Sequence, residues 1–366
     1  MMDTPPIPLV RYAAVPDSRM LLIQPPTRYG RVPPALHGFA CEDADMARTF
    51  LTALAQAEEQ VPAEAVMAYR DMRVLDGRFL LTREGAGVQE SFADVKVEDV
   101  ILHRHPGRAA QLVAGEAMQL PAAGPPAVVL FKEHGDWYGH LVAEILPRLV
   151  HLADAGVREV RLLVPQMALH LVPVLEFALG ALGIRAEGVV CPEGSVLHVA
   201  ELIWVTPVSC YNLQSSPTLL RLMERLRAAA GPADGPRKLF VARPAAARRA
   251  VTNAAEVASV AEAAGFTVVE PSSLPVARQV ALFAGAAHLA GPWGSGLVLS
   301  AAMAPGGRVT MIDPGVADCF FWDIACLAGL RFDWVFTQAV RPGAIERKET
   351  PTAIDTALLQ DVLHAA

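Results

Sequence analysis

Short apolar runs rich in β-branched residues alternate with helical stretches from Ala127 onward, and this alternation constrains the fold more than any other feature of the chain. It is typical of helices that pack in layers around a parallel sheet, so we predict an α/β fold. In the first part of this region the expected strands are 127–131, 159–164, 188–191 and 202–205, and the expected helices are 137–155, 168–182 and 217–230.

A second run of the same kind follows the segment Gly231–Pro236, which has two glycines, two prolines and no apolar anchor. We predict that 231–236 is a linker, since 366 residues are enough for about two domains. Asn253 with Glu256 predicts a capping box, and Ser273 predicts the cap of the next helix. The expected strands are 238–242, 266–269, 288–290 and 308–312, and the expected helices are 253–264, 275–284, 295–303 and 352–364.

The first 125 residues are less regular and rich in proline. One helix is expected over 44–59. A hairpin is expected over 66–82, turned by Asp76-Gly77, because this pair tolerates the positive φ angles of a tight turn. We therefore expect an irregular α+β N-terminal extension.

Hydrophobic residues make up 53% of the chain and the mean hydropathy is +0.33, which raises the question of a membrane protein. The one candidate span is the uncharged stretch 279–307, but its glycines and prolines predict strand, turn and short helix instead. No secretory signal is visible, and the five scattered cysteines are typical of reduced thiols in a cytosolic protein. We expect a cytoplasmic protein without a transmembrane segment.

The net charge of −7 makes a nucleic acid polymer an unfavourable partner, because a phosphate backbone attracts a basic surface.

The high hydrophobic content is due largely to alanine, whose side chain is apolar but small.

Three groups of residues can carry chemistry, and the first is His140, Glu144 and Arg148 at successive i+4 steps. On one helix these three side chains share a face. The helix follows a strand, so its beginning is expected at the carboxyl edge of the sheet, where ligands bind in open α/β folds. A His–Glu pair there can act as a general base. The alternative is an internal ion pair between Glu144 and Arg148 with a buried histidine; a zinc site lacks a third ligand.

The second group is Arg243 at the end of a strand, followed by Arg248 and Arg249. A guanidinium group can donate two parallel hydrogen bonds to the oxygens of one phosphate. A strand end places Arg243 at the mouth of a cleft. The alternative for Arg248 and Arg249 is a solvated surface.

The third group is the glycine turn from Ala290 to Leu297, which joins a strand to a short helix. Its backbone N–H groups can bind a phosphate at the positive end of the helix. The order GxxGxG differs from the dinucleotide motif GxGxxG. Asp313 after the next strand keeps an NAD(P)-dependent oxidoreductase open as an alternative, although the intervening helix is short for that fold.

Together these groups resemble glycosyltransferase family 61, and the resemblance covers about 132–330. Tyr138-Gly-His140-Leu-Val-Ala-Glu144-Ile-Leu-Pro-Arg148-Leu is similar to the family's pattern of histidine, acid and Leu-Pro-Arg-Leu. Lys238-Leu-Phe-Val-Ala-Arg243 with Arg249 and Asn253 is similar to its strand-and-arginine motif. Gly291-Pro-Trp-Gly-Ser-Gly-Leu297 is similar to its glycine-rich loop.

The resemblance implies a GT-B-like architecture, in which two Rossmann-like domains face each other across a cleft. It implies inverting transfer of a sugar from a nucleotide-diphosphate sugar to a glycan or lipid-linked acceptor in surface polysaccharide biosynthesis. Peripheral association with the inner face of the membrane is left open. The implied domains are an N-terminal extension (1–125), an acceptor side (126–230), a linker (231–236), a donor side (237–345) and a C-terminal helix (346–366).

The resemblance also implies the roles of single residues. His140 or Glu144 is the expected base, and Asp136, Arg148 and Asn253 support the site. The expected donor-binding residues are Arg243, Arg249, Glu270, Trp293, Gly294, Ser295 and Gly296. No metal or other cofactor is expected, because arginines and a helix N-terminus usually stabilise the leaving diphosphate in GT-B enzymes.

Two departures from the family pattern concern these roles. Family members usually carry histidine where this chain has Trp293, and asparagine near Asp136 or Trp137. An indole cannot accept a proton, although it can stack on a ring. A protein that binds nucleotide sugars without turning them over is therefore the alternative function.

Overall fold

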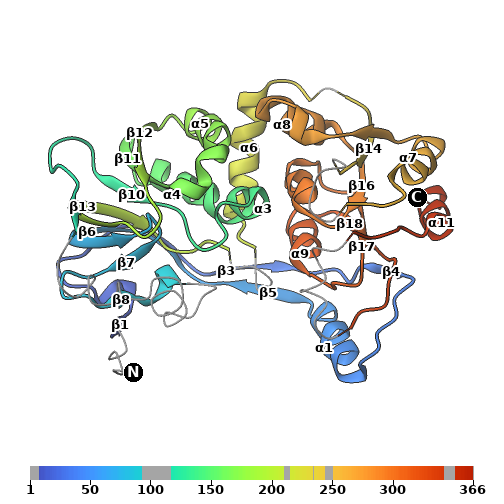
Figure 1. The fold of residues 1–366 in the computed structure, drawn as a ribbon, viewed down its shortest axis with the longest axis horizontal. Helices are drawn as coiled ribbons and strands as arrows, with labels where there is room; N and C mark the ends of the chain where they lie inside the picture. Colours follow the sequence, from blue (N-terminus) through green and yellow to red (C-terminus); the bar gives the residue numbers. More distant parts are fainter. Residues whose placement is uncertain are drawn as a thin grey trace. The chain divides into compact units, whose positions relative to one another are not determined.

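The computed structural model describes residues 8–92, 117–209, 215–233, 235–243, 250–341 and 351–365. The chain divides into two compact units, each with its own sheet and helices (Figure 1). Unit 1 comprises Met1–Thr27 and Val61–Tyr211, and unit 2 comprises Arg28–Gln60 and Asn212–Ala366. The predicted α/β fold is confirmed.

Unit 1 contains a mixed sheet in the order β1-β8-β7-β6-β13-β10-β11-β12, with β2 on β6 and β9 on β13. Its strands are β1 (Leu9–Val10), β2 (Arg19–Gln24), β6 (Glu64–Leu75), β7 (Phe79–Leu81), β8 (Gly87–Val88), β9 (Met118–Gln119), β10 (Ala127–Val129), β11 (Glu159–Pro165), β12 (Arg185–Cys191) and β13 (Val196–Val205). Its helices are η1 (Tyr12–Ala14), η2 (Gln89–Phe92), α3 (Tyr138–His140), η4 (Leu141–Ile145), α4 (Pro147–Asp154), η5 (Gln166–Leu171) and α5 (Val172–Ala181).

The strands β13, β10, β11 and β12 of this sheet run parallel. Strand β10 comes first in the chain and lies between β11 and β13, so the order of connection reverses beside it. In open α/β sheets ligands bind outside the carboxyl ends of the strands at such a reversal. The residues after Val129 are therefore well placed to form a site.

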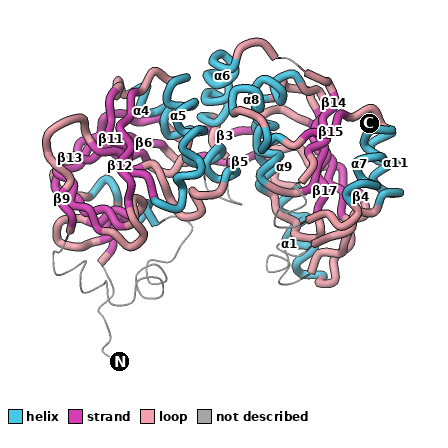
Figure 2. The backbone as a smooth tube through the Cα atoms, turned by 45° about the horizontal axis from the view of Figure 1, so that its top comes forward, coloured by secondary structure: helices cyan, strands magenta, loops and turns pink. Residues whose placement is uncertain are grey.

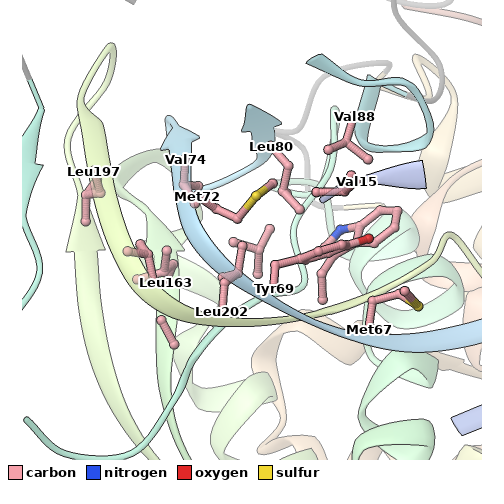
Figure 3. Close-up of a cluster of buried hydrophobic side chains, with 14 of the residues drawn as sticks. Val15, Met67, Tyr69, Met72, Val74, Leu80, Val88, Leu163, Leu197 and Leu202 are labelled. Carbon is pink, nitrogen blue, oxygen red and sulfur yellow. The ribbon is translucent and has the colours of Figure 1, made fainter. Parts of the chain in front are cut away.

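A buried hydrophobic cluster of unit 1 gathers side chains from the parallel strands and from the curved β-hairpin of the same sheet. Figure 3 shows Leu163 and Leu202 facing Val74 and Leu80 of that hairpin, and all four are fully or almost fully buried. The hairpin predicted over 66–82 is confirmed as β6 and β7, which are antiparallel and pair Leu75 with Phe79. Burial of such apolar side chains supplies the main free energy of folding.

Unit 2 contains a parallel sheet in the order β15-β14-β16-β17-β18-β4. Its strands are β4 (Ala35–His37), β14 (Lys238–Val241), β15 (Thr267–Val269), β16 (His288–Pro292), β17 (Arg308–Asp313) and β18 (Arg331–Phe336). Its helices are α1 (Ala44–Leu54), α6 (Thr218–Ala230), α7 (Ala254–Ala263), η6 (Pro271–Ser273), α8 (Val276–Gly285), η7 (Ser295–Ala302), α9 (Phe320–Leu327) and α11 (Thr356–His364). Separately, β3 (Thr27–Gly30) pairs with β5 (Glu58–Val61).

Helices cover both faces of the unit 2 sheet. Figures 1 and 2 show α7 and α11 on one face and α8 and α9 on the other. From β14 to β18 the order is that of a doubly wound fold, in which the first strand lies between the second and the third. The reversal point of this sheet lies between β14 and β16.

The N-terminal part is not a separate extension, because its strands belong to both sheets. Residues 28–60 lie in unit 2, where β4 extends the sheet beside β18. Asp323 of α9 holds this segment, since its Oδ1 accepts hydrogen bonds from the Tyr29 hydroxyl at 2.6 Å and from Arg31 Nη2 at 2.6 Å. The helix predicted over 44–59 ends at Leu54, and β5 begins at Glu58.

The division between the units precedes the segment 231–236, where the sequence predicts a linker. Helix α6 belongs to unit 2 because it packs on α8 and η7. The uncharged stretch 279–307 forms the end of α8, then β16 and η7, and it stops just before β17. In the described ranges, no helix has the length and apolar character needed to cross a membrane.

His288 on β16 is buried, and its Nε2 lies 2.9 Å from Thr310 Oγ1. Burial, and then the positive charge of Arg308, lower the pKa of His288 from 6.5 to about 4. Where folding lowers the pKa of a histidine, the folded state is most stable at pH values above the unfolded-state pKa. This stability is lost as the pH falls below that pKa towards the folded-state pKa.

We expect the free energy of unfolding to fall between pH 6.5 and about 4 through His288, by up to about 3 kcal/mol. In His288→Phe this part of the pH dependence should disappear, because phenylalanine does not titrate. Urea denaturation at a series of pH values measures it. The same substitution at exposed His364 is the control, and equal slopes in both variants would contradict the assignment.

Candidate active site

The loop after β10 folds back tightly on the helix that follows it. A Cβ at Gly135 would lie 3.0 Å from the carbonyl oxygen of Lys132 and 2.7 Å from Ile145 Cδ1. Only glycine fits there without displacing its neighbours. His134 before it has a positive φ of 60°. This backbone brings Lys132 to the first turns of the helix.

Lys132, His140 and Glu144 form a buried cluster at the carboxyl end of β10. Glu144 Oε2 lies 2.8 Å from Lys132 Nζ and 2.9 Å from His140 Nδ1. The side chain of Glu144 is 0% exposed, that of Lys132 2% and that of His140 10%. Both partners contact the same oxygen, and Oε1 of Glu144 has no hydrogen-bond partner in the described part of the chain.

Glu144 remains a carboxylate despite its burial. Burial alone raises the pKa of a carboxyl group, but here the charge of Lys132 and the hydrogen bond from His140 outweigh it and lower the pKa of Glu144. The carboxylate therefore fixes His140 through Nδ1. With Nδ1 facing the carboxylate, proton exchange with a substrate would take place at the other ring nitrogen, Nε2.

Arg148 does not continue this cluster. Residues 141–145 form one π-helical turn, in which the Leu146 N–H donates to the Leu141 carbonyl. A π turn shifts the residues that follow it around the helix axis, and such turns are frequent at functional sites. Arg148 Nη1 instead donates to the Leu130 carbonyl at 2.7 Å, which ties the helix to the end of β10. The alternative of a Glu144–Arg148 ion pair is thus wrong.

Aromatic rings surround His140 in the same loop. Its ring centroid lies 5.8 Å from that of Trp137 and 5.7 Å from that of His134. Asp136 lies in the same loop and is half-buried. The structure therefore places Asp136 in the loop without joining it to Glu144.

In unit 2, Arg243 and the glycine turn meet at the reversal point between β14 and β16. Arg243 Nη2 donates to the carbonyl of Trp293. Gly294 follows with a φ of 152°, and a Cβ there would overlap the guanidinium group. A shallow pocket at this edge includes Arg243, Trp293, Thr337 and Thr352 in its lining.

The other glycines of the turn allow β14 to approach closely. A Cβ at Gly291 would lie 2.9 Å from the Val241 carbonyl oxygen, and one at Gly296 would lie 2.7 Å from Val241 Cγ1. The short helix predicted after the turn is a 3₁₀ helix, η7, which begins at Ser295 without a side-chain cap. Part of the glycine pattern is thus explained by packing.

Trp293 is only 5% exposed, and its indole N–H donates to Asp318 Oδ2 at 3.0 Å. Asp318 also accepts the N–H of Phe320 at 2.9 Å, at the start of α9. The ring is therefore held inside unit 2, and stacking on a ligand would require it to leave this position.

Asp313 does not act as a ribose-binding acid. It is fully buried and accepts hydrogen bonds from the N–H groups of Val316 and Ala317 and from the Trp334 indole at 2.6, 3.0 and 2.8 Å. Burial raises its pKa to about 6. Because this side chain is occupied by structural contacts, the oxidoreductase alternative loses the residue on which it depended.

The remaining expected site residues lie elsewhere in unit 2. Glu270 is exposed after β15, where it accepts a hydrogen bond from Ser272 at 3.2 Å. Asn253 precedes α7 but does not cap it: its amide pairs with the backbone N–H and C=O of Ile354, both at 2.9 Å. Ser273 does not cap α8 either. Arg249 lies outside the described residues.

Lys132 and Asp318 were not predicted from the sequence. Lys132 is signalled by its position, because it directly follows the apolar run from Ala127 to Phe131 and is the first charge at a strand end. Asp318 has no such signal, since its role depends on contact with Trp293, 25 residues away. Across the described ranges, no three or more His, Cys, Asp or Glu side chains come together as a metal site.

A comparison with models of protein families finds a match. Residues 138–310 match the model of the family described as Glycosyltransferase 61. The match includes His140, Glu144, Arg243 and the glycine turn, and it excludes Lys132. No curated protein matches the chain.

We expect Lys132→Met to lower the free energy of unfolding by about 3–5 kcal/mol, because it leaves the Glu144 carboxylate buried without its main cation. Lys132→Met/Glu144→Gln should recover much of this loss, since no buried charge remains. Urea denaturation compares the two variants, with Lys238→Met as the control. Equal destabilisation of the single and double variants would show that the ion pair is not the cause.

Proposed function

Since residues 138–310 belong to glycosyltransferase family 61, we propose that the protein is an inverting glycosyltransferase with a nucleotide-diphosphate sugar as donor. The acceptor would be a hydroxyl group of a glycan or lipid-linked glycan in surface polysaccharide biosynthesis. The contact of His140 with a buried, ionised Glu144 carries the proposal, because inversion requires a base that deprotonates the acceptor hydroxyl.

We assign the base to His140 and not to Glu144. A carboxylate with a lowered pKa is a weak base, and the Glu144 side chain is completely buried. His140 retains some exposure and has its Nδ1 fixed by Glu144. In the proposed step the acceptor oxygen attacks the anomeric carbon, its proton passes to His140 Nε2, and the bond from that carbon to the diphosphate oxygen breaks.

Lys132 would act on this step through Glu144. Its positive charge keeps Glu144 ionised, and the ionised Glu144 holds His140 through Nδ1. Lys132 is thus a positioning residue for the base.

The donor would bind to unit 2. Arg243, with Arg249 as a second cation, would neutralise the leaving diphosphate, and the backbone N–H groups of Gly294, Ser295 and Gly296 would bind one phosphate. The place of Arg243 at the reversal point of the sheet supports this assignment. Glu270 would contact the ribose. No metal ion is required in this proposal, because cationic side chains and N–H groups meet the developing charge.

The two sheets would correspond to the acceptor and donor halves of a GT-B-like enzyme, with unit 1 as the acceptor half. We propose that it acts in the cytoplasm or at the inner face of the membrane. The alternative, a protein that binds nucleotide sugars without transfer, is favoured by Trp293 in place of the family histidine. The His140–Glu144 pair, whose geometry suits a base, favours an enzyme.

Arg243→Ala should weaken binding of the correct nucleotide sugar at least tenfold, because the diphosphate loses a charge-assisted partner. Calorimetric titration with UDP, GDP, CMP and TDP sugars in the presence of EDTA identifies the donor and measures the loss. Arg48→Ala on α1 of unit 2 is the control.

Two results would contradict this assignment. One is that no nucleotide sugar binds; the other is that Arg243→Ala binds as tightly as the unchanged protein. Binding that EDTA abolishes and Mg²⁺ restores would show instead that the donor site requires a metal.

His140→Gln should lower kcat for release of free nucleotide from the donor by about 10²–10⁴-fold, while the donor affinity stays unchanged. Glu144→Gln should lower kcat less than His140→Gln does and should shift the pH profile of kcat, because the imidazole remains but loses its carboxylate. A coupled assay of free nucleotide measures both. Binding without any release in the unchanged protein would favour the non-catalytic alternative.

A further inference from the structure

A pocket of about 360 Å³ lies in unit 1, where the turn between β6 and β7 packs against the carboxyl ends of β11 and β12. This volume is at the lower end of the roughly 300–1,000 Å³ found for small-molecule sites. The side chains that matter in its lining are Asp76, Arg78, Gln166, Met167, Cys191 and Glu193.

The shape of the pocket is fixed by its backbone. Asp76 and Gly77 have φ angles of 56° and 68°, as a tight hairpin turn requires. A Cβ at Gly77 would lie only 2.9 Å from Cys191 Sγ, so the turn is in close contact with the end of β12. The Gly194 N–H donates to Asp76 Oδ1, which fixes the segment after β12 beside the turn. These contacts hold the turn against the end of β12.

Arg78 connects the pocket to the candidate active site. Its Nη1 donates to Glu133 Oε2 at 3.1 Å, and Glu133 directly follows Lys132. Arg78 is itself only 5% exposed, and its Nε has no acceptor among the described residues. A ligand held here would therefore lie at the same carboxyl edge of the sheet as His140.

The charges around Arg78 decide which ligand the pocket can take. Asp76 and Glu133 both contact its guanidinium group, and Glu193 adds a third carboxylate at the pocket. Among the described residues, these three carboxylates outnumber the one guanidinium group, which disfavours a phosphate or an acidic sugar. Sugar hydroxyl groups suit this mixture, because they donate to carboxylates and accept from the guanidinium group and from the Gln166 amide.

We propose that this pocket binds one neutral sugar ring of the acceptor glycan and rejects acidic sugars. Met167 is 39% exposed at the pocket and offers an apolar contact for the C–H face of the ring. The role of the ring as part of the acceptor rests on the proposed function, whereas its binding does not. Asp76 and Arg78 precede the matched residues 138–310, whereas Gln166, Met167 and Glu193 lie within them, so the pocket combines residues from both parts of the chain.

The test observes Met167 directly by NMR of the full chain with ¹³C-labelled methionine methyl groups, assigned with Met167→Leu. Methyl β-D-glucopyranoside and methyl β-D-galactopyranoside are the neutral probes, and methyl β-D-glucuronide is the acidic probe. We expect a saturable shift of the Met167 signal with a neutral probe and at least tenfold weaker binding of the glucuronide.

Glu193→Gln should narrow the difference between neutral and acidic probes, because it removes one carboxylate from the pocket. Glu187→Gln on β12, exposed and outside the lining, is the matched control and should leave the difference unchanged. The proposal is overturned if no neutral probe shifts Met167, if the glucuronide binds equally well, or if both variants behave alike.

These titrations contain no nucleotide, so they are independent of the donor experiments. If the protein binds a neutral sugar but releases no nucleotide, the proposal for the pocket stands and the proposal of a transferase fails. If it releases nucleotide but the Met167 signal does not shift, the proposal of a transferase stands and the proposal for the pocket fails.

Discussion

The buried ion pair between Lys132 and Glu144 is the constraint on which the candidate site depends. A carboxylate without solvent exposure is stable only if a cation and hydrogen bonds replace its water. Lys132 and His140 supply both at a single oxygen, at 2.8 and 2.9 Å. The price of this arrangement is a backbone that must fold back at Gly135, where no side chain fits. The loop, the π turn and the orientation of His140 thus follow from keeping one charge inside the protein.

Unit 2 holds charge in a different way. Arg243 is fixed by a backbone carbonyl, that of Trp293, and the glycines around it let the strands approach each other closely. A neutral acceptor orients a guanidinium group without itself cancelling the positive charge, which suits the proposed contact with an anionic diphosphate. In unit 1, Lys132 and Arg78 are held by carboxylates. Both candidate sites lie at a reversal point of their sheet.

Local patterns in the sequence predict much of this fold. The strands from Ala127 onward and the turn at Asp76-Gly77 depend on apolar periodicity and on turn residues close in sequence. The error at α1 has a local origin too, because its helical pattern continues past Leu54 into residues that pair as β5. The assignment of 28–60 to unit 2 is different: it depends on Asp323 holding Arg31, nearly three hundred residues apart, and no local pattern reports such a contact.

The candidate site also combines features that a local sequence pattern predicts with features that it does not. An i+4 spacing predicts that His140 and Glu144 meet, and they do, whereas Arg148 leaves the shared face because one π turn breaks the regular spacing. Asp313 has the position of a ligand-binding acid but is used by two backbone N–H groups and an indole. A strand end gives a residue the opportunity to bind a ligand. Whether it does so depends on how many hydrogen bonds from the protein itself the side chain already accepts, and Asp313 already accepts three.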